Sequence, residues 1–349
     1  MLKECVIIIM VVEMNLENLF ISLGYKKEEY LHILNYYYVN KLFEDTLINN
    51  VKSNFDWLLD NGYSKDRAIN ITLNNPSIYL NKTDTLNNKV NNFINLGLER
   101  AEVLKIIRKS PRLLSLSQDY INQKFQYIIS LGYTKEEALK ICKTFPIMLA
   151  INLETMENKI KDVESLGFTR NEVINMTKKF PGLFSLSQEN RQSKINELIE
   201  LGYTNIEVKN MLKIMPSLFS LTIDNIKQKI YDVINLGYTK EEVIDMTVEF
   251  PQALTLSIEN LKPKIEFFNS IGLHDLIIIS PIRLIQSISL SYARYNFLND
   301  NGIEVNMENY RILFLGKSAF EKRYGISTEQ LLAIYDYDKE LGKTEKGII

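Results

Sequence analysis

Lysine and arginine recur at a fixed step in the middle of this 349-residue chain, in a pattern that could bind phosphate groups. Four of them, spaced 35 residues apart and each three residues before a proline, form what we call the pre-proline column: Arg108, Lys143, Lys178 and Lys213. Neutralisation of phosphates supplies much of the affinity of proteins for nucleic acid. The alternative is that a cation at the end of a helix complements the helix dipole. Lys109 and Lys179, each next to a column member, fit either account.

A second set of cations stands thirteen residues after each proline. This helix-two column comprises Lys89, Lys124, Lys159, Lys194, Lys229, Lys264 and Arg294. A lysine beside an apolar stripe can bury its alkyl stem and extend its ammonium group. That ammonium could reach a ligand in a groove, or donate to the free carbonyls of a helix that a proline ends. Because the column persists where Leu73 and Val248 replace the pre-proline cations, we favour the structural role.

Other side chains could also contact a polymeric ligand. Arg112 directly follows Pro111, and a cluster near the C-terminus contains Lys317, Lys322 and Arg323. Such a cluster is more often a solvated face than a binding site. Four aromatic residues could stack on bases, although their helical or turn spacing favours packing in the core: Phe145, Phe180, Phe184 and Phe219.

The overall charge does not indicate a strongly basic protein. The chain carries 41 Lys+Arg against 43 Asp+Glu, a formal net charge of −2. Residues 97–236 hold 20 cations and 16 anions, whereas residues 1–96 hold 9 and 11 and residues 237–349 hold 12 and 16. The basic excess therefore lies in the middle of the chain and is modest. Hydrophobic residues make up 46%, enough for a substantial core.

Motifs for enzymatic, metal or cofactor chemistry are absent from the sequence. Its two cysteines, Cys5 and Cys142, and its two histidines, His32 and His274, are not clustered, so no disulfide framework, zinc site or histidine-based triad is expected. No Walker A loop, GxGxxG, HExxH or GxSxG occurs. We therefore expect a protein that is not an enzyme and holds no metal or cofactor.

The apolar run at residues 5–12 is too short to cross a bilayer, which needs about 20 residues. No small-residue cleavage site follows it, so a signal peptide is weakly supported. Initiation at Met10 or Met14 is an equal alternative to a true N-terminal segment. We expect a cytoplasmic protein without membrane association.

Internal repetition determines the predicted architecture. Prolines recur every 35 residues at Pro76, Pro111, Pro146, Pro181, Pro216 and Pro251, and glycines keep the same step at Gly62, Gly97, Gly132, Gly167, Gly202, Gly237 and Gly272. Each unit predicts a helix that begins after the glycine, a turn at the proline, and a second helix that ends at the next glycine. Neighbouring units must stack, because one such pair of short helices cannot bury a core alone.

Particular residues predict the ends of these helices. A T-x-x-E capping box begins the first helix at Thr134, Thr169, Thr204 and Thr239, and the proline ends it. The second helix is expected to begin at Ser117, Ser187, Thr222 and Ser257. In the turn GLFSLS we expect Leu183, Phe184 and Leu186 to pack inward.

The units at the two ends depart from the regular pattern. We predict an N-terminal segment at 1–23, a degenerate capping repeat at 24–61 with Tyr38 in the proline position, and six regular repeats at 62–280. A degenerate repeat and a helical cap with a frayed tail should fill 281–349.

The pattern LGxxxxEVxxMxxxFPxLLSLSxENLxxKIxxL over residues 62–300 resembles the mitochondrial transcription termination factor (mTERF) family. The resemblance implies an all-α solenoid, curved from right to left as a left-handed superhelix, with two α-helices and a short 3-10 turn per unit. It also implies binding of double-stranded DNA or structured RNA along the concave face, with effects on transcription or ribosome assembly.

We therefore expect a monomer that holds nucleic acid in its groove through backbone phosphates. The candidate contacts are Arg108, Lys143, Lys178, Lys213, Arg112, Lys109, Lys179, Lys124, Lys159, Lys194 and Lys229. A protein-interaction scaffold that uses the same groove is the main alternative, and it suits the nearly neutral charge. A hydrolase with a site in the cap is a third, weaker class.

Overall fold

The computed structural model describes residues 15–40 and 44–339. These residues form α-helices, short 3-10 helices and turns, and no β-strand occurs among them, so the predicted all-α class is confirmed. The apolar segment 5–12 and the predicted frayed end at 340–349 lie outside the described residues. The chain divides into two compact units: Met1–Ser165 with Thr169–Ile174, and Leu166–Phe168 with Asn175–Ile349.

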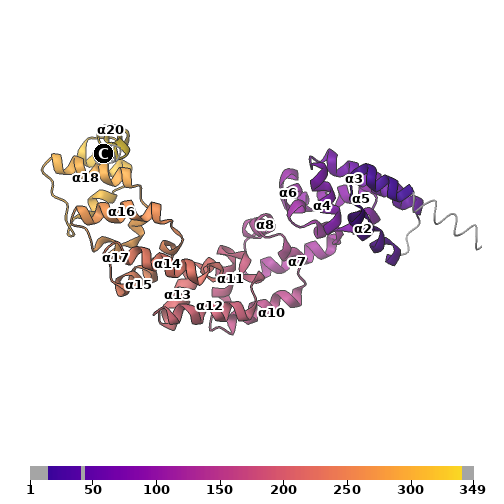
Figure 1. The fold of residues 1–349 in the computed structure, drawn as a ribbon, viewed down its shortest axis with the longest axis horizontal. Helices are drawn as coiled ribbons and strands as arrows, with labels where there is room; N and C mark the ends of the chain where they lie inside the picture. Colours follow the sequence, from indigo (N-terminus) through magenta and orange to yellow (C-terminus); the bar gives the residue numbers. More distant parts are fainter. Residues whose placement is uncertain (1–14, 41–43, 340–349) are drawn as a thin grey trace, which may run out of the picture. The chain divides into compact units, whose positions relative to one another are not determined.

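Three elements recur in the same order along the chain (Figure 1). The first helices are α4 (Lys65–Asn74), α6 (Arg100–Lys109), α8 (Lys135–Thr144), α11 (Arg170–Lys179), α13 (Asn205–Ile214) and α15 (Lys240–Glu249). The turns that follow are η1 (Pro76–Leu80), η2 (Pro111–Ser115), α9 (Ile147–Ala150), η3 (Pro181–Ser185), η4 (Pro216–Ser220) and η5 (Pro251–Thr255). The second helices are α5 (Thr83–Leu96), α7 (Gln118–Ser130), α10 (Leu153–Glu164), α12 (Gln188–Glu200), α14 (Ile223–Ile234) and α16 (Ile258–Ser270).

Reciprocal hydrogen bonds begin the first helices where the capping boxes predict them. The backbone N–H of Thr204 donates to Glu207 Oε2 at 2.7 Å, and the N–H of Glu207 donates back to Thr204 Oγ1 at 3.3 Å. The same pair of bonds occurs at Thr134, Thr169 and Thr239. The predicted caps of the second helices are also confirmed, since each hydroxyl accepts from the N–H three residues later: Ser117, Ser187, Thr222 and Ser257. Side-chain caps replace partners that a helix terminus lacks.

Proline ends each first helix at ten residues. The residue before it leaves the helical region, as at Phe180 with φ −139° and ψ 82°, because the proline ring crowds α geometry there. The proline then opens the 3-10 turn, where its missing N–H costs nothing. Glycine closes the second helix in a left-handed conformation, as at Gly97 with φ 114°, which side chains with a Cβ rarely adopt.

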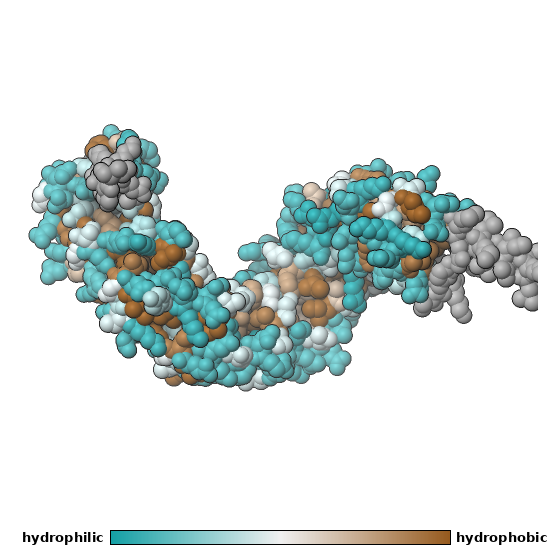
Figure 2. Space-filling model, in the orientation of Figure 1, coloured by the Kyte–Doolittle hydropathy of each residue, from teal (hydrophilic) through white to brown (hydrophobic). Residues whose placement is uncertain are grey.

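Within each unit, like elements of successive repeats lie side by side. First helix packs on first helix, as for α6 with α8 and α13 with α15, and second helix packs on second helix, as for α12 with α14. The 3-10 turns align in the same way, η1 with η2 and η3 with η4. Figure 2 shows hydrophilic residues over most of the visible surface, with apolar patches between them.

A tyrosine directly after the glycine ties one repeat to the next, a feature that sequence analysis missed. The Tyr203 hydroxyl lies 2.6 Å from Thr247 Oγ1, and both side chains are buried. Tyr63 donates to the Leu104 carbonyl at 2.6 Å. Tyr238 donates to the His274 carbonyl at 2.9 Å. Each bond satisfies a polar tip whose ring belongs to the core.

Three local expectations need correction. The turn after Pro146 is a single α-helical turn, α9, and not a 3-10 turn. Leu183 and Phe184 are buried as predicted, but Leu186 is only half-buried, because it begins the extended link to the second helix. In the capping repeat, α2 (Lys27–Asn40) runs for 14 residues, since Tyr38 cannot end a helix as proline does.

Helices also enclose both ends of the array. α3 (Glu44–Asp60) follows α2 and packs against η1, α4 and α5. At the other end, the shortened repeat contains α17 (Leu276–Ile279), η6 (Pro281–Ile285) and α18 (Ile288–Asp300). Then follow η7 (Tyr310–Phe314), α19 (Lys317–Tyr324) and α20 (Thr328–Ile334), and α20 packs on α18.

The capping boxes give a test of these helix starts. Thr204→Ala removes the side-chain acceptor of the Glu207 N–H, so we expect the free energy of unfolding to fall by about 1 kcal/mol. Urea denaturation followed by circular dichroism measures the change. Ser185→Ala, at an exposed position in η3, should leave the curve unchanged. Equal effects of the two substitutions would contradict a capping role for Thr204.

Candidate nucleic-acid interface

The pre-proline column lies in the last turns of four first helices. Arg108 is exposed in α6, whereas Lys143, Lys178 and Lys213 are half-buried in α8, α11 and α13. Lys143 Nζ lies 2.6 Å from Glu102 Oε1 of the preceding repeat, with 41% and 29% of the two side chains exposed. The Lys143 hydrogen bond lowers the pKa of the Glu102 carboxyl, with help from the Glu99 backbone. Lys143 therefore joins two first helices, and its charge is partly neutralised.

Lys109 and Lys179 contact the ends of neighbouring helices. Lys109 Nζ donates to the Lys143 carbonyl at 3.1 Å, and Lys179 Nζ donates to the carbonyls of Lys213 at 2.8 Å and Ile214 at 3.3 Å. These carbonyls belong to the last turn of the next first helix, where cations are favourable. Both lysines thus place a cation at the C-terminal end of a helix, as the helix-dipole account predicts, but that helix belongs to the next repeat. Both remain exposed.

Arg108 and Arg112 differ from the other candidates. Both are exposed, and neither forms a hydrogen bond or an ion pair with another described residue. They lie four residues apart across the junction of α6 and η2, so both belong to the edge where first helices end. We call this edge the turn edge: the last turn of each first helix together with the turn that follows it.

Cations gather in the last turn of four first helices, α6, α8, α11 and α13, whereas α4 and α15 carry none there and α15 ends at Glu249. Acidic residues occupy the first turns, including Asp66, Glu102, Glu136, Glu172, Glu207 and Glu241. Cations occupy the last turns: Arg108, Lys109, Lys143, Lys178, Lys179 and Lys213. A polyanion is therefore favoured at the last turns of these four helices, while their first turns hold cations such as Arg100, Lys135 and Arg170 beside the carboxylates.

The helix-two column lies mostly inside the protein. Lys89 Nζ donates to the Leu116 carbonyl at 2.7 Å, and Lys264 Nζ donates to the Leu284 carbonyl at 2.6 Å. Arg294 is 2% exposed and donates to the carbonyls of Leu313 and Leu315 at 2.9 and 2.7 Å. Each acceptor lies in or just after the turn of the following repeat. These three contacts support the structural role that we favoured.

Four members of this column were also candidate contacts for nucleic acid. Lys124 is 1% exposed and Lys194 is 7% exposed, with Lys194 Nζ 2.7 Å from Glu197 Oε2. A buried ammonium cannot contact a phosphate in this conformation, so both leave the candidate interface. Lys159 and Lys229 are half-buried on the second helices, away from the turn edge.

Lys124 is the exception within its column. Its ammonium has no hydrogen-bond partner among the described residues and lies 5.9 Å from the centre of the Tyr120 ring. The carbonyl of Ile151, in the position equivalent to Leu116, accepts from the Tyr120 hydroxyl at 3.2 Å. This is the repeat with the α-helical turn α9. Burial lowers the pKa of Lys124 to about 8.

The buried Arg191 also donates hydrogen bonds to carbonyls of a turn, but the turn belongs to its own repeat. Arg191 is 1% exposed and donates to the carbonyls of Leu183 at 3.2 Å and Leu186 at 2.8 Å. The sequence carried a signal for it, because Arg191 occupies the apolar-stripe position of Ile121 in an earlier repeat. A lone cation in an otherwise apolar column indicates buried carbonyls that need a donor.

The remaining candidates divide between surface and core. Lys317, Lys322 and Arg323 are exposed in the cap, and Arg323 lies 5.4 Å from the centre of the Tyr324 ring. Phe184 and Phe219 are buried, whereas Phe145 and Phe180 are half-buried before their prolines. The two buried rings cannot stack on bases in this conformation.

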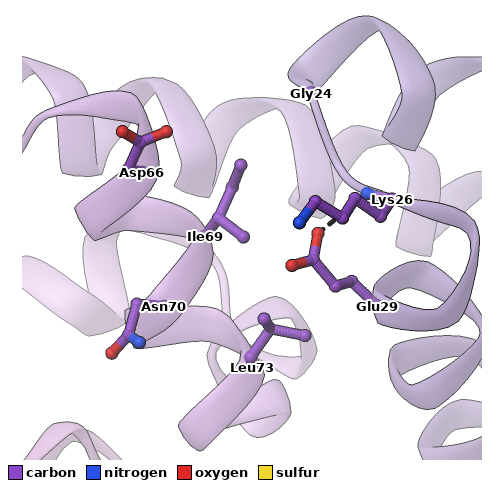
Figure 3. Close-up of a pocket in the computed structure, with 7 residues that line it drawn as sticks. All are labelled: Gly24, Lys26, Glu29, Asp66, Ile69, Asn70 and Leu73. Carbon is purple, nitrogen blue, oxygen red and sulfur yellow. Dashed lines mark hydrogen bonds between the residues drawn. The ribbon is translucent and has the colours of Figure 1, made fainter.

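Two pockets in the described part of the chain lie between first helices, and another lies between α3 and α5. Figure 3 shows one of about 210 Å³, where Glu29 from α2 faces Ile69 and Leu73 of α4. Glu29 accepts from the Lys26 backbone N–H at 2.8 Å, so it caps a helix. Among the described residues, no three His, Cys, Asp or Glu side chains are grouped to hold a metal, and no helix is long and apolar enough to cross a membrane.

Stacked repeats of two helices joined at a proline define the described part of the chain as an all-helical repeat protein. The mTERF family model matches residues 3–163 and 154–321. The chain therefore belongs to the mTERF family. No curated protein matches it.

The helix-two column can be tested at Lys264. Lys264→Met keeps the stem but leaves the buried Leu284 carbonyl without its donor, so we expect unfolding to become easier by about 1–3 kcal/mol. Thermal melts at neutral pH measure this. The matched control is Lys262→Met, because Lys262 is exposed and only loosely paired with Glu266. Equal melting temperatures for the Lys264 variant and the parent would refute a structural role.

Replacing Lys124 should stabilise the protein, whereas replacing Lys264 should destabilise it. Burial lowers the pKa of Lys124 in the folded state to about 8, below the usual lysine value of 10.5, so burying the charged form costs stability below pH 8. The cost shrinks between pH 8 and 10.5, where only the unfolded state holds the proton. Lys124→Met should therefore raise the free energy of unfolding at pH 7, on the order of 2–3 kcal/mol. Melts at pH 7 and pH 10 should show that gain fade, and destabilisation at pH 7 would contradict it.

Proposed function

We propose that this protein binds duplex DNA or structured RNA through backbone phosphates at the turn edge. The observation that carries the proposal is the pair Arg108 and Arg112, exposed at one edge without a partner among the described residues. Most other cations near this edge already contact a carboxylate or a helix end. An exposed guanidinium can form two parallel hydrogen bonds to a phosphate, which favours arginine at such contacts.

Membership of the mTERF family supports this proposal, because its members are generally nucleic-acid-binding proteins without enzymatic activity. We propose the same for this chain. Contacts to phosphate position a protein without reading bases, so the binding should tolerate many sequences. By occupying a duplex or a folded RNA, the protein would regulate transcription or RNA and ribosome metabolism.

The proposed contacts are assigned within each compact unit. In the first unit they are Arg108 and Arg112, with Lys109 beside them. In the second unit, Lys178, Lys179 and Lys213 lie at the turn edge of α11 and α13. Because few cations are exposed at this edge, we expect moderate affinity with a salt dependence set by a few phosphate contacts.

Binding across a salt series tests this function. The full chain is titrated into labelled duplex DNA and, separately, a labelled RNA hairpin, and anisotropy gives Kd at several salt concentrations. We expect Kd to rise with salt, with a log–log slope of a few units. Arg108→Glu with Arg112→Glu should weaken binding at least tenfold and lower the slope by about one unit per lost phosphate contact.

The matched control reverses two exposed cations of the same unit away from the turn edge, Lys52→Glu and Arg67→Glu. This control has the same net charge as the test variant and should bind within about threefold of the parent. Equal losses in both variants would show a diffuse charge effect. No binding at low salt would refute the function and favour the protein-interaction scaffold.

A further inference from the structure

The outward face of three successive first helices in the second unit has an unusual composition. α13, α15 and α17 lie side by side, with η6 following α17. We define the isoleucine–acid surface by eight exposed residues of these elements, beside which Asn205, Asn210 and Lys240 are also exposed: Ile206, Ile214, Glu241, Asp245, Glu249, Ile279, Ile282 and Ile285. All of them belong to the second compact unit.

The isoleucines of this surface are largely exposed to solvent. Ile206 is 74% exposed, Ile279 63% and Ile285 54%. Ile279, Ile282 and Ile285 stand two residues before, one after and four after their proline. The same positions in an earlier repeat hold Lys109, Arg112 and Ser115. The terminal repeat thus replaces a polar edge with three isoleucines, and contiguous exposed apolar surface commonly marks a protein-binding site.

An acidic ridge separates the two groups of isoleucines. Glu241, Asp245 and Glu249 are spaced by four residues on α15, so they share one face, and all three are exposed. No lysine or arginine of the described residues forms an ion pair with them. Because α13 and α17 flank α15, Ile206 and Ile214 lie on one side of the ridge and Ile279 on the other.

A pocket opens at the start of this ridge. It has a volume of about 270 Å³ and is lined by Glu207, Glu241 and Asp245, with Ile244 and Lys240 also in its wall. It lies between consecutive first helices, in the repeat position of the pocket in Figure 3. Glu207 is already bonded to Thr204 in its capping box, and Lys240 brings a cation. Glu241 and Asp245 beside Ile244 are therefore the groups that suit the head and stem of a long basic side chain.

We propose that the isoleucine–acid surface docks a cationic amphipathic helix of a partner protein. Lysine or arginine at positions i, i+4 and i+8 of that helix would meet the three carboxylates, which step about 6 Å along α15. Leucine-like residues on either side would cover the isoleucines. This interaction goes beyond nucleic-acid binding and uses a different set of residues.

Charge and area distinguish this occupant from others. A nucleic acid or an anionic membrane would be repelled by the acidic ridge. In a symmetric pair of chains, two acidic ridges would meet. Five isoleucines also fall short of the roughly 1,000 Å² that a stable dimer needs to bury. A single helix laid on a surface, by contrast, needs only a few apolar anchors.

The test uses the full chain and a labelled synthetic helical peptide with lysine at i, i+4 and i+8 and leucine at the flanking positions. A second peptide replaces the lysines with glutamate. We expect the lysine peptide to bind at least tenfold more tightly by fluorescence anisotropy. Asp245→Lys with Glu249→Lys should weaken that binding at least tenfold, and Ile279→Asn with Ile282→Asn should do the same. All substituted residues are exposed, so the melting temperatures should stay close to that of the parent.

The matched control, Glu200→Lys with Glu304→Lys, makes the same charge change at exposed positions elsewhere in this unit and should bind within twofold of the parent. Equal affinity for both peptides, or an equal loss in the control, would overturn the proposal. Sedimentation equilibrium tests whether a second copy of this chain occupies the surface instead. Self-association that Ile279→Asn abolishes would assign the surface to that second copy and overturn the proposal. The nucleic-acid affinity of Asp245→Lys with Glu249→Lys, measured in parallel, should not fall, and a fall would also overturn it.

Discussion

The proline at the centre of each repeat imposes the constraint on which the rest of the structure depends. It ends the first helix at ten residues and starts a short turn, whose carbonyls have fewer partners than those of a continuing helix. Donors must therefore come from outside the turn. Lys89, Lys264 and Arg294 supply them to the following repeat, and Arg191 supplies them within its own. At Lys89, Lys264 and Arg294 this requirement therefore couples a repeat to the one that follows it.

This use of cations separates the net charge of the protein from the charge of its surface. Part of its positive charge is buried in the helix-two column, and part contacts neighbouring helix ends, as at Lys109 and Lys179. At the turn edge, Arg108 and Arg112 are exposed and form no hydrogen bond or ion pair with another described residue. Net charge is a poor guide to such a protein, because position decides which charges reach the surface.

Repetition also separates positions that build the array from positions that are free to vary. Inward positions keep apolar residues, and the glycine, proline and capping residues recur in phase. Outward positions change along the chain, from Lys105 and Lys109 on α6 to Ile206 and Ile214 on α13 and Asp245 and Glu249 on α15. One scaffold can therefore present surfaces of different chemistry, because the outward residues contribute little to stacking.

The sequence by itself determined the helices, their caps and the turns, since proline, glycine and T-x-x-E act on the backbone within a few residues. It also indicated that the helix-two column is structural, although not that Lys124 lacks a partner. Only the tertiary structure decided which cations are buried, that Lys143 pairs with Glu102, and that the Gly+1 tyrosines bridge repeats. These contacts join residues about 20 to 45 positions apart, so they depend on how one repeat packs on the next, which no local pattern encodes.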